Sequence, residues 1–122
     1  MSVIHWFEIP AKDIERAVKF YKSVLDFEMP ILDVTAQMGS MLGMFPDNRG
    51  ALVQNSQFGY EPSKTGTLVY LALGDIDMNI PLDKVEPAGG KVLLPKTAMG
   101  DQGFSAWIED CEGNKVGLHS TK

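Results

Sequence analysis

The chain of 122 residues has little cysteine, no surplus of basic residues and no long apolar run. Its single cysteine, Cys111, cannot form an intrachain disulfide and rules out a zinc or iron–sulfur site built from several cysteines. The formal net charge is −5, and the 11 Lys and Arg residues are scattered rather than gathered in a patch. Nucleic-acid-binding proteins usually carry a basic patch or stripe, so we expect no nucleic-acid partner. No apolar run approaches the ~20 residues of a membrane span, so we expect no membrane partner.

The N-terminal residues, MSVIHWFEIP, lack both the charged region and the apolar segment of a secretory signal. Together with the single cysteine, this predicts a cytoplasmic location. Hydrophobic residues make up 44% of the chain and charged residues 22%, which is ordinary for a globular protein with its own core. We therefore expect one soluble domain that spans residues 1–122.

Two stretches of the chain resemble each other. Trp6–Ile14 and Leu68–Ile76 each combine an apolar strand with Asp-Ile and a following helical pattern, and Asp13 and Asp75 are 62 residues apart, about half the chain. A repeat at this spacing predicts one small unit that is used twice. We expect module one at about residues 1–55, a linker at about 56–66 and module two at about 67–122.

The expected elements follow the order βαβββ in both modules. Asp13 is a candidate N-cap for a helix whose apolar residues recur at helical spacing up to Leu25. In the second module, Pro81 and Pro87 limit the helix to a short segment within residues 75–88. Strands are expected at 3–9, 27–34, 37–45 and 51–54, and then at 67–73, 91–96, 103–109 and 115–120.

Several of these segments resemble the vicinal oxygen chelate superfamily, which includes glyoxalase I, extradiol dioxygenases and bleomycin resistance proteins. The resemblance rests on Asp13–Ala17 with Phe20–Tyr21, on Ala88–Val92, and on Asp110–Val116, where Cys111 replaces the proline of the family's usual turn. It implies an α+β fold in which two βαβββ modules form a half-open barrel around a concave cleft. It also implies a small-molecule ligand and a homodimer.

The resemblance allows the family's metal positions to be located on this chain. Side chains alternate between the two faces of a strand, so one face can be followed in steps of two residues. The four ligand positions then fall on Trp6, Ala51, Leu68 and Gly117, whose side chains cannot bind a divalent metal. We therefore predict that the usual metal site is absent. A shift of the first strand by one residue would instead make His5 a ligand, so a divalent metal remains the alternative.

The same face carries a mostly apolar set of residues with a few polar groups, which is the usual composition of a small-molecule site. Glu8 and His119 are the candidate catalytic residues, since a carboxylate and an imidazole can work as an acid/base pair. The alternative is a purely structural role, in which these two side chains form a buried hydrogen-bonded pair. The expected substrate-binding residues are Trp6, Val53, Leu68, Tyr70 and Gly117.

Three functions fit this pattern. The first is a glyoxalase-like protein without the metal site and without another cofactor, with acid/base chemistry of the isomerase or lyase class. The second is a binding protein that sequesters a drug or toxin, as bleomycin resistance proteins do. The third is a metal-dependent lyase or dioxygenase like glyoxalase I. Cys111 has no basic neighbour in sequence, so we expect an incidental thiol rather than a nucleophile.

Overall fold

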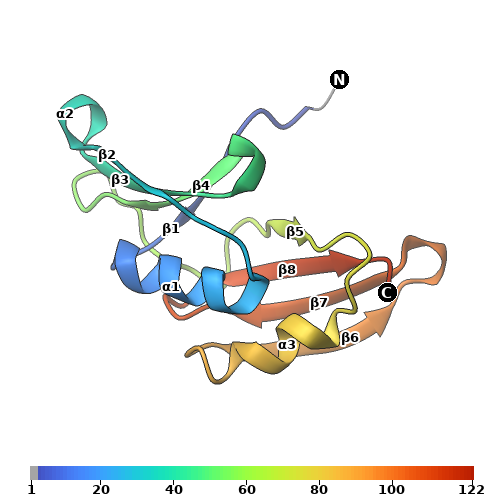
Figure 1. Cartoon of the computed structure of the whole chain (residues 1–122). Helices are drawn as coiled ribbons and strands as arrows, with labels where there is room; N and C mark the ends of the chain where they lie inside the picture. The colour runs from blue at the N-terminus through green and yellow to red at the C-terminus, as the bar shows by residue number, and fades with distance from the viewer. Residues whose placement is uncertain (1–2) are drawn as a thin grey trace.

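The computed structural model describes residues 3–122 and contains two four-stranded sheets, with the helix of residues 14–25 between them (Figure 1). The first sheet has the strand order β1-β4-β3-β2 and the second the order β5-β8-β7-β6. In each sheet, the first strand of the module pairs in parallel with the last, while the other pairs are antiparallel. This confirms the α+β class and the two βαβββ modules. The sheets do not close into a barrel.

The first module contains β1 (Phe7–Pro10), α1 (Ile14–Leu25), β2 (Ile31–Val34), α2 (Thr35–Met38), β3 (Ser40–Met44), the 3-10 turn η1 (Pro46–Asn48) and β4 (Gly50–Gln54). The second contains β5 (Tyr70–Ala72), α3 (Asn79–Val85), β6 (Lys91–Ala98), the 3-10 turn η2 (Gly100–Gln102), β7 (Phe104–Glu109) and β8 (Lys115–Ser120).

Helix α1 follows the sequence pattern closely. The Asp13 side chain accepts a hydrogen bond from the Arg16 backbone N–H, and the helix ends at Asp26, which adopts a left-handed conformation with φ 56°. The buried residues of the helix recur three and four positions apart, and the stripe they form faces the core. They are Ile14, Ala17, Val18, Phe20, Tyr21 and Val24.

The structure corrects several expected boundaries. The strand expected at 37–45 is preceded by the helical turn α2, because Asp33 accepts hydrogen bonds from the N–H and hydroxyl of Thr35 and so bends the chain. Gly39, with φ 76°, ends this turn. The first strand begins at Phe7 rather than Val3, and β5 spans only three residues. Helix α3 begins at Asn79, with Pro81 buried in its first turn.

The main hydrophobic core fills the space between the sheets. It joins α1 and α3 to the inward-facing side chains of both modules, such as Ile9 and Leu52 of the first sheet and Leu71 and Leu118 of the second. Because strand residues alternate between faces, the neighbours of these residues point to the outer face of each sheet. None of the helices within residues 3–122 is long and apolar enough to cross a membrane.

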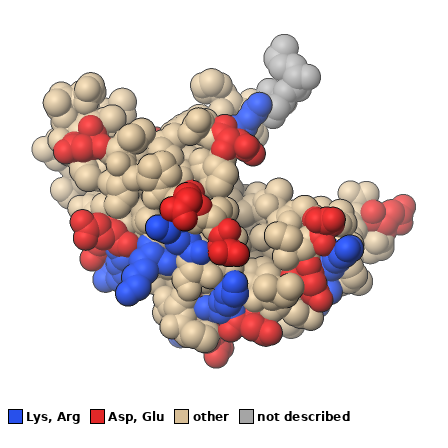
Figure 2. Space-filling model, in the orientation of Figure 1, with Lys and Arg blue, Asp and Glu red and all other residues tan. Residues whose placement is uncertain are grey.

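Charged side chains of both signs are mixed over the visible surface. Figure 2 shows Lys and Arg atoms beside Asp and Glu atoms across this face of the molecule, without a broad area of one sign. The ion pairs of the protein include Lys12 with Glu61 at 3.6 Å and Lys22 with Glu28 at 3.6 Å. Exposed pairs of this kind contribute little to stability.

Candidate functional site

The outer face of the first sheet holds Glu8 in a fixed orientation. The Tyr60 hydroxyl donates to Glu8 Oε1 at 2.6 Å, and the Trp6 indole N–H donates to Glu8 Oε2 at 3.0 Å. The hydrogen bond to Glu8 raises the pKa of Tyr60, and partial burial adds to the effect. Trp6 and Tyr60 also pack against buried apolar residues of this face, including Val53. The result is a carboxylate with directed donors beside an apolar surface.

Tyr60 is not among the site residues predicted from the sequence, because it lies in the segment interpreted as the linker. The only signal for it in the sequence is a bulky aromatic residue within a stretch otherwise rich in Ser, Gly, Pro and Thr. Residues 55–66 fold back toward β1, and this brings Tyr60 to Glu8 across 52 sequence positions.

The outer face of the second sheet carries the other predicted site residues. Tyr70 lies directly opposite Gly117, and His119 lies two residues further along β8. His119 Nε2 contacts the backbone carbonyl of Gln102 at 2.5 Å. A carbonyl can only accept a hydrogen bond, so Nε2 carries the proton, and the Nδ1 of a neutral imidazole keeps its lone pair. Leu68 is half-buried and precedes β5 rather than lying within it.

Glu8 and His119 do not form a hydrogen-bonded pair within the described residues. Glu8 accepts from Trp6 and Tyr60, and His119 contacts the Gln102 carbonyl. Glu8 lines a cavity of about 240 Å³ at the boundary between the modules, together with Pro10, Val69 and Lys115. His119 lies four residues beyond Lys115 on the same strand, which corresponds to roughly 13 Å. Within one chain, the Glu8 carboxylate and the His119 imidazole therefore lie apart.

The residues at the family's metal positions do not fit a metal ion. Trp6 and Ala51 in the first module, and Leu68 and Gly117 in the second, are the residues that the sequence predicts for these positions. No group of three or more His, Cys, Asp or Glu side chains within residues 3–122 is arranged to hold a metal. His5 is exposed and precedes β1, whereas Trp6 packs against the outer face of the sheet.

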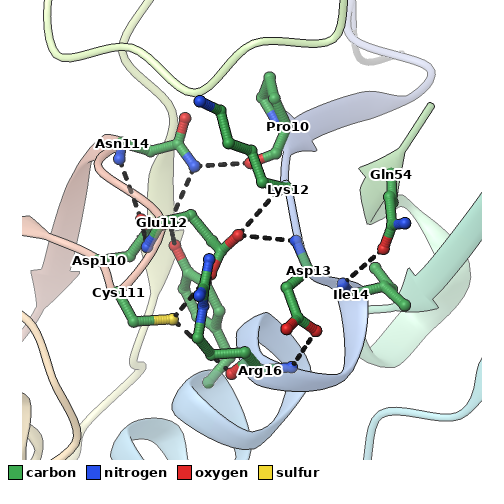
Figure 3. A network of polar contacts seen from close by, with 11 residues as sticks. Pro10, Lys12, Asp13, Ile14, Arg16, Gln54, Asp110, Cys111, Glu112 and Asn114 are labelled. Carbon is green, nitrogen blue, oxygen red and sulfur yellow. Dashed lines mark hydrogen bonds and ion pairs between the residues drawn. The ribbon is translucent and has the colours of Figure 1, made fainter. Parts of the chain in front are cut away.

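A network of polar contacts joins the two modules at the start of α1 (Figure 3). Glu112 Oε1 accepts hydrogen bonds from the backbone N–H groups of Lys12 (2.7 Å) and Asp13 (2.9 Å), and Glu112 Oε2 contacts Arg16 Nε at 2.5 Å. The Gln54 side chain accepts from the Ile14 N–H at 2.7 Å. These contacts satisfy N–H groups that an isolated helix would leave unpaired.

The turn that carries Glu112 is itself held in the core. The buried Asp110 accepts a hydrogen bond from the Tyr21 hydroxyl at 2.6 Å and others from Asn114, whose side chain also donates to the Pro10 carbonyl. Cys111 lies in the same turn, and its burial beside Glu112 raises the pKa of its thiol to about 12. A thiol with so high a pKa is a poor nucleophile at neutral pH. The network connects the Cys111 turn to α1 and to the end of β1.

Comparisons with known proteins agree with this architecture. The sequence model of the Glyoxalase/Bleomycin resistance protein/Dioxygenase superfamily matches residues 3–118. CFP32 of Mycobacterium tuberculosis, a protein named as a glyoxylase, is 29% identical over 116 residues that cover 93% of this chain and 44% of that protein. The chain thus spans about half the length of this curated relative.

Two solved structures illustrate the likeness of fold. A glyoxylase/bleomycin resistance protein/dioxygenase domain from Frankia superposes with a TM-score of 0.72 and 13% identity, covering 100% of this chain and 93% of the other. The fosfomycin resistance protein FosX from Listeria monocytogenes gives a TM-score of 0.67 and 9% identity, covering 100% and 93%. Because the model of this superfamily matches residues 3–118, the chain belongs to the glyoxalase/bleomycin resistance protein/dioxygenase superfamily.

Proposed function

We propose that this protein binds a small, largely apolar organic molecule and moves a proton on it without the superfamily's metal site. The reaction class is isomerisation or lyase-type elimination next to a carbonyl group. Glu8 acts as the base, His119 as the second proton-transfer group, and Tyr70 positions the substrate. The observation that carries the proposal is the Glu8 carboxylate, held by Trp6 and Tyr60 beside apolar side chains.

The hydrogen bonds of Glu8 suit this role. Each carboxylate oxygen keeps a second lone pair after it has accepted one hydrogen bond. Glu8 can therefore take a proton from a carbon next to a carbonyl group, while the electron pair of the broken C–H bond moves toward the carbonyl oxygen. When that carbon carries a hydroxyl group, transfer of the hydroxyl proton to the former carbonyl oxygen and return of the abstracted proton to the former carbonyl carbon complete an isomerisation. Because the Tyr60 and Trp6 donors fix the carboxylate before the substrate arrives, little reorganisation is needed.

The contact of His119 with Gln102 supports a complementary role. With its proton held at Nε2 by the Gln102 carbonyl, neutral His119 offers the Nδ1 lone pair to a substrate hydroxyl. The substrate hydroxyl that loses its proton, and the oxyanion that takes the proton back, would both lie next to this nitrogen. Glu8 and His119 then act at different atoms of one ligand rather than on each other.

The metal-dependent alternative is disfavoured by the donor set, since Trp6, Ala51, Leu68 and Gly117 offer no imidazole, carboxylate or thiolate. Elemental analysis of protein purified without a chelator tests this point. Stoichiometric zinc, nickel, iron or manganese, with loss of ligand binding after chelation, would contradict the proposal.

Deuterium exchange tests the proposed chemistry directly. Small α-hydroxy ketones carry an acidic C–H, and incorporation of deuterium from D2O at that carbon is measured by NMR. We expect exchange with the wild-type protein and a loss of about 100-fold or more in Glu8→Gln and His119→Ala, which is the usual weight of a general base or acid. Glu61→Gln, an exposed carboxylate at the edge of the same cavity, is the matched control and should retain the rate.

The same experiment separates catalysis from sequestration. The observation that favours sequestration is the exposure of the Tyr70 face. Tight calorimetric binding of a compound by wild type and Glu8→Gln alike, with no exchange in either, would replace the enzymatic proposal with the sequestering one.

A further inference from the structure

The second sheet places two aromatic side chains and a glycine in one row. Tyr70 of β5 lies opposite Gly117 of β8, and Gly117 lies opposite Trp107 of β7. Residues directly opposite one another on adjacent strands share a face, and this row belongs to the outer face. Tyr70 keeps 47% of its surface exposed there.

Gly117 allows the Tyr70 ring to lie flat across β8. A Cβ atom added at Gly117 would lie 2.5 Å from Tyr70 Cδ2 and 2.8 Å from its Cγ, so any larger residue would displace the ring. Because the ring crosses the glycine, its hydroxyl reaches the Trp107 indole N–H at 2.8 Å. This hydrogen bond joins the two aromatic side chains.

This contact leaves a donor available for a ligand. The indole N–H can only donate, so the Tyr70 oxygen accepts, and the hydroxyl keeps its own proton. Within residues 3–122, no acceptor takes that proton. Trp107 therefore holds the Tyr70 hydroxyl as a hydrogen-bond donor at an exposed position.

A positive charge lies against the same indole. Lys115 Nζ is 4.9 Å from the centre of the Trp107 ring. Glu109, the residue opposite Lys115 on β7, pairs instead with Lys64 at 3.4 Å. Two other carboxylates line the same cavity as Lys115: Glu8 accepts hydrogen bonds from Trp6 and Tyr60, and Glu61 pairs with Lys12. Lys115 therefore forms none of the ion pairs found within residues 3–122.

We propose that this row binds the anionic group of a planar aromatic carboxylate, with the Tyr70 hydroxyl and the Lys115 ammonium as its two donors. Both donors flank one indole, so a carboxylate placed against Trp107 meets them together, and the aromatic body of the ligand covers the exposed aromatic surface. Charge-assisted hydrogen bonds supply the affinity for the anion, and stacking supplies the selectivity for planar molecules. Trp107 is a positioning residue for Tyr70. The inference deepens the proposed function by naming the ligand class of the Tyr70 face.

Titration with three probes tests this site. Isothermal calorimetry with 2-naphthoate should give saturable binding, with weaker binding of cyclohexanecarboxylate and no binding of 2-naphthylmethylamine. In Lys115→Met and in Tyr70→Phe, which keeps the ring, we expect the dissociation constant for 2-naphthoate to rise about tenfold or more. Trp107→Phe should weaken binding through loss of the Tyr70 contact. In the wild type, the Trp107 indole N–H signal should shift on titration.

Lys19→Met, an exposed lysine of α1, is the matched control and should bind 2-naphthoate like the wild type. Equal affinity in Lys115→Met and Lys19→Met, or equal binding of the amine and the carboxylate, would overturn the proposal. Binding of 2-naphthoate that survives in Glu8→Gln while deuterium exchange is lost would separate this site from the proposed catalytic step. If the wild type shows no deuterium exchange but binds 2-naphthoate, the catalytic proposal fails and the carboxylate site stands.

Discussion

At the scale of single residues, Glu112 contributes more to the structure than its position in a turn suggests. Its side chain is fully shielded from solvent and binds two backbone N–H groups and one guanidinium. Burial works to raise the pKa of Glu112, but the hydrogen bonds from Arg16, Asp13 and Lys12 outweigh it and hold the pKa below its ordinary value. The charged form is therefore the one that stabilises the folded chain.

Glu112→Gln should lower the free energy of unfolding by about 1–3 kcal/mol at pH 7, because a hydrogen-bonded charge is lost. A carboxylate whose folded pKa is depressed stabilises the fold above its unfolded pKa, near 4.5, and this contribution disappears as pH falls through the folded pKa. The difference from wild type, measured by urea unfolding, should therefore shrink between pH 5 and about pH 3. Glu28→Gln, an exposed carboxylate, is the control, and an equal loss of stability in it would refute the assignment.

At the scale of secondary structure, α1 packs closely on the first sheet because β3 carries a glycine beneath it. A Cβ atom added at Gly43 would lie 2.6 Å from Val18 Cγ2 and 3.5 Å from Ile14 Cδ1. Val18 is β-branched and buried, so it has few alternative rotamers with which to move away. The glycine thus sets the distance between the helix and the sheet.

Gly43→Ala should destabilise the protein by about 1–3 kcal/mol, the usual cost of inserting a methyl group into a packed core. Gly66→Ala is the matched control, since its added Cβ would approach only Ser63 Oγ, at 3.9 Å, and should change stability by no more than about 0.5 kcal/mol. Thermal and urea unfolding measure both. An unchanged stability in Gly43→Ala would mean that the helix can shift outward without cost.

At the scale of the whole molecule, one chain does not assemble the proposed catalytic groups. Helix α1 lies between the sheets (Figure 1), and the main core fills the space around it. Because strand residues alternate between faces, each module presents its site residues on the outer face of its sheet. Glu8 belongs to the first module and His119 to the second, and no hydrogen bond joins the two within residues 3–122. We propose a homodimer in which the Glu8 face of one chain meets the His119 face of its partner, with the ligand between the two faces.

Sedimentation at micromolar concentration should give the mass of two chains, about twice 13.4 kDa. Mixing Glu8→Gln with His119→Ala, after dissociation and reassociation, should restore about a quarter of the wild-type exchange activity, because one of the two sites in each mixed dimer is intact. Each variant reassociated alone is the control. A monomer at all concentrations, or no recovery of activity in the mixture, would contradict a shared site.

The sequence by itself determined the local elements and the chemical limits of this protein. The Asp13 cap and the apolar stripe up to Leu25 define α1, because capping and helical spacing act between near neighbours. Strand alternation places Trp6 and Glu8 on one face, and residue chemistry alone removes Trp6, Ala51, Leu68 and Gly117 as metal ligands.

The tertiary structure decided which side chains contact one another across long stretches of sequence. Tyr60 reaches Glu8 across 52 positions, Trp107 reaches Tyr70 across 37, and Glu112 reaches Asp13 across 99. It also decided that Glu8 and His119 are apart within one chain. Such contacts depend on how the two sheets and the segment between them pack around a common core, and no local pattern of residues encodes that arrangement.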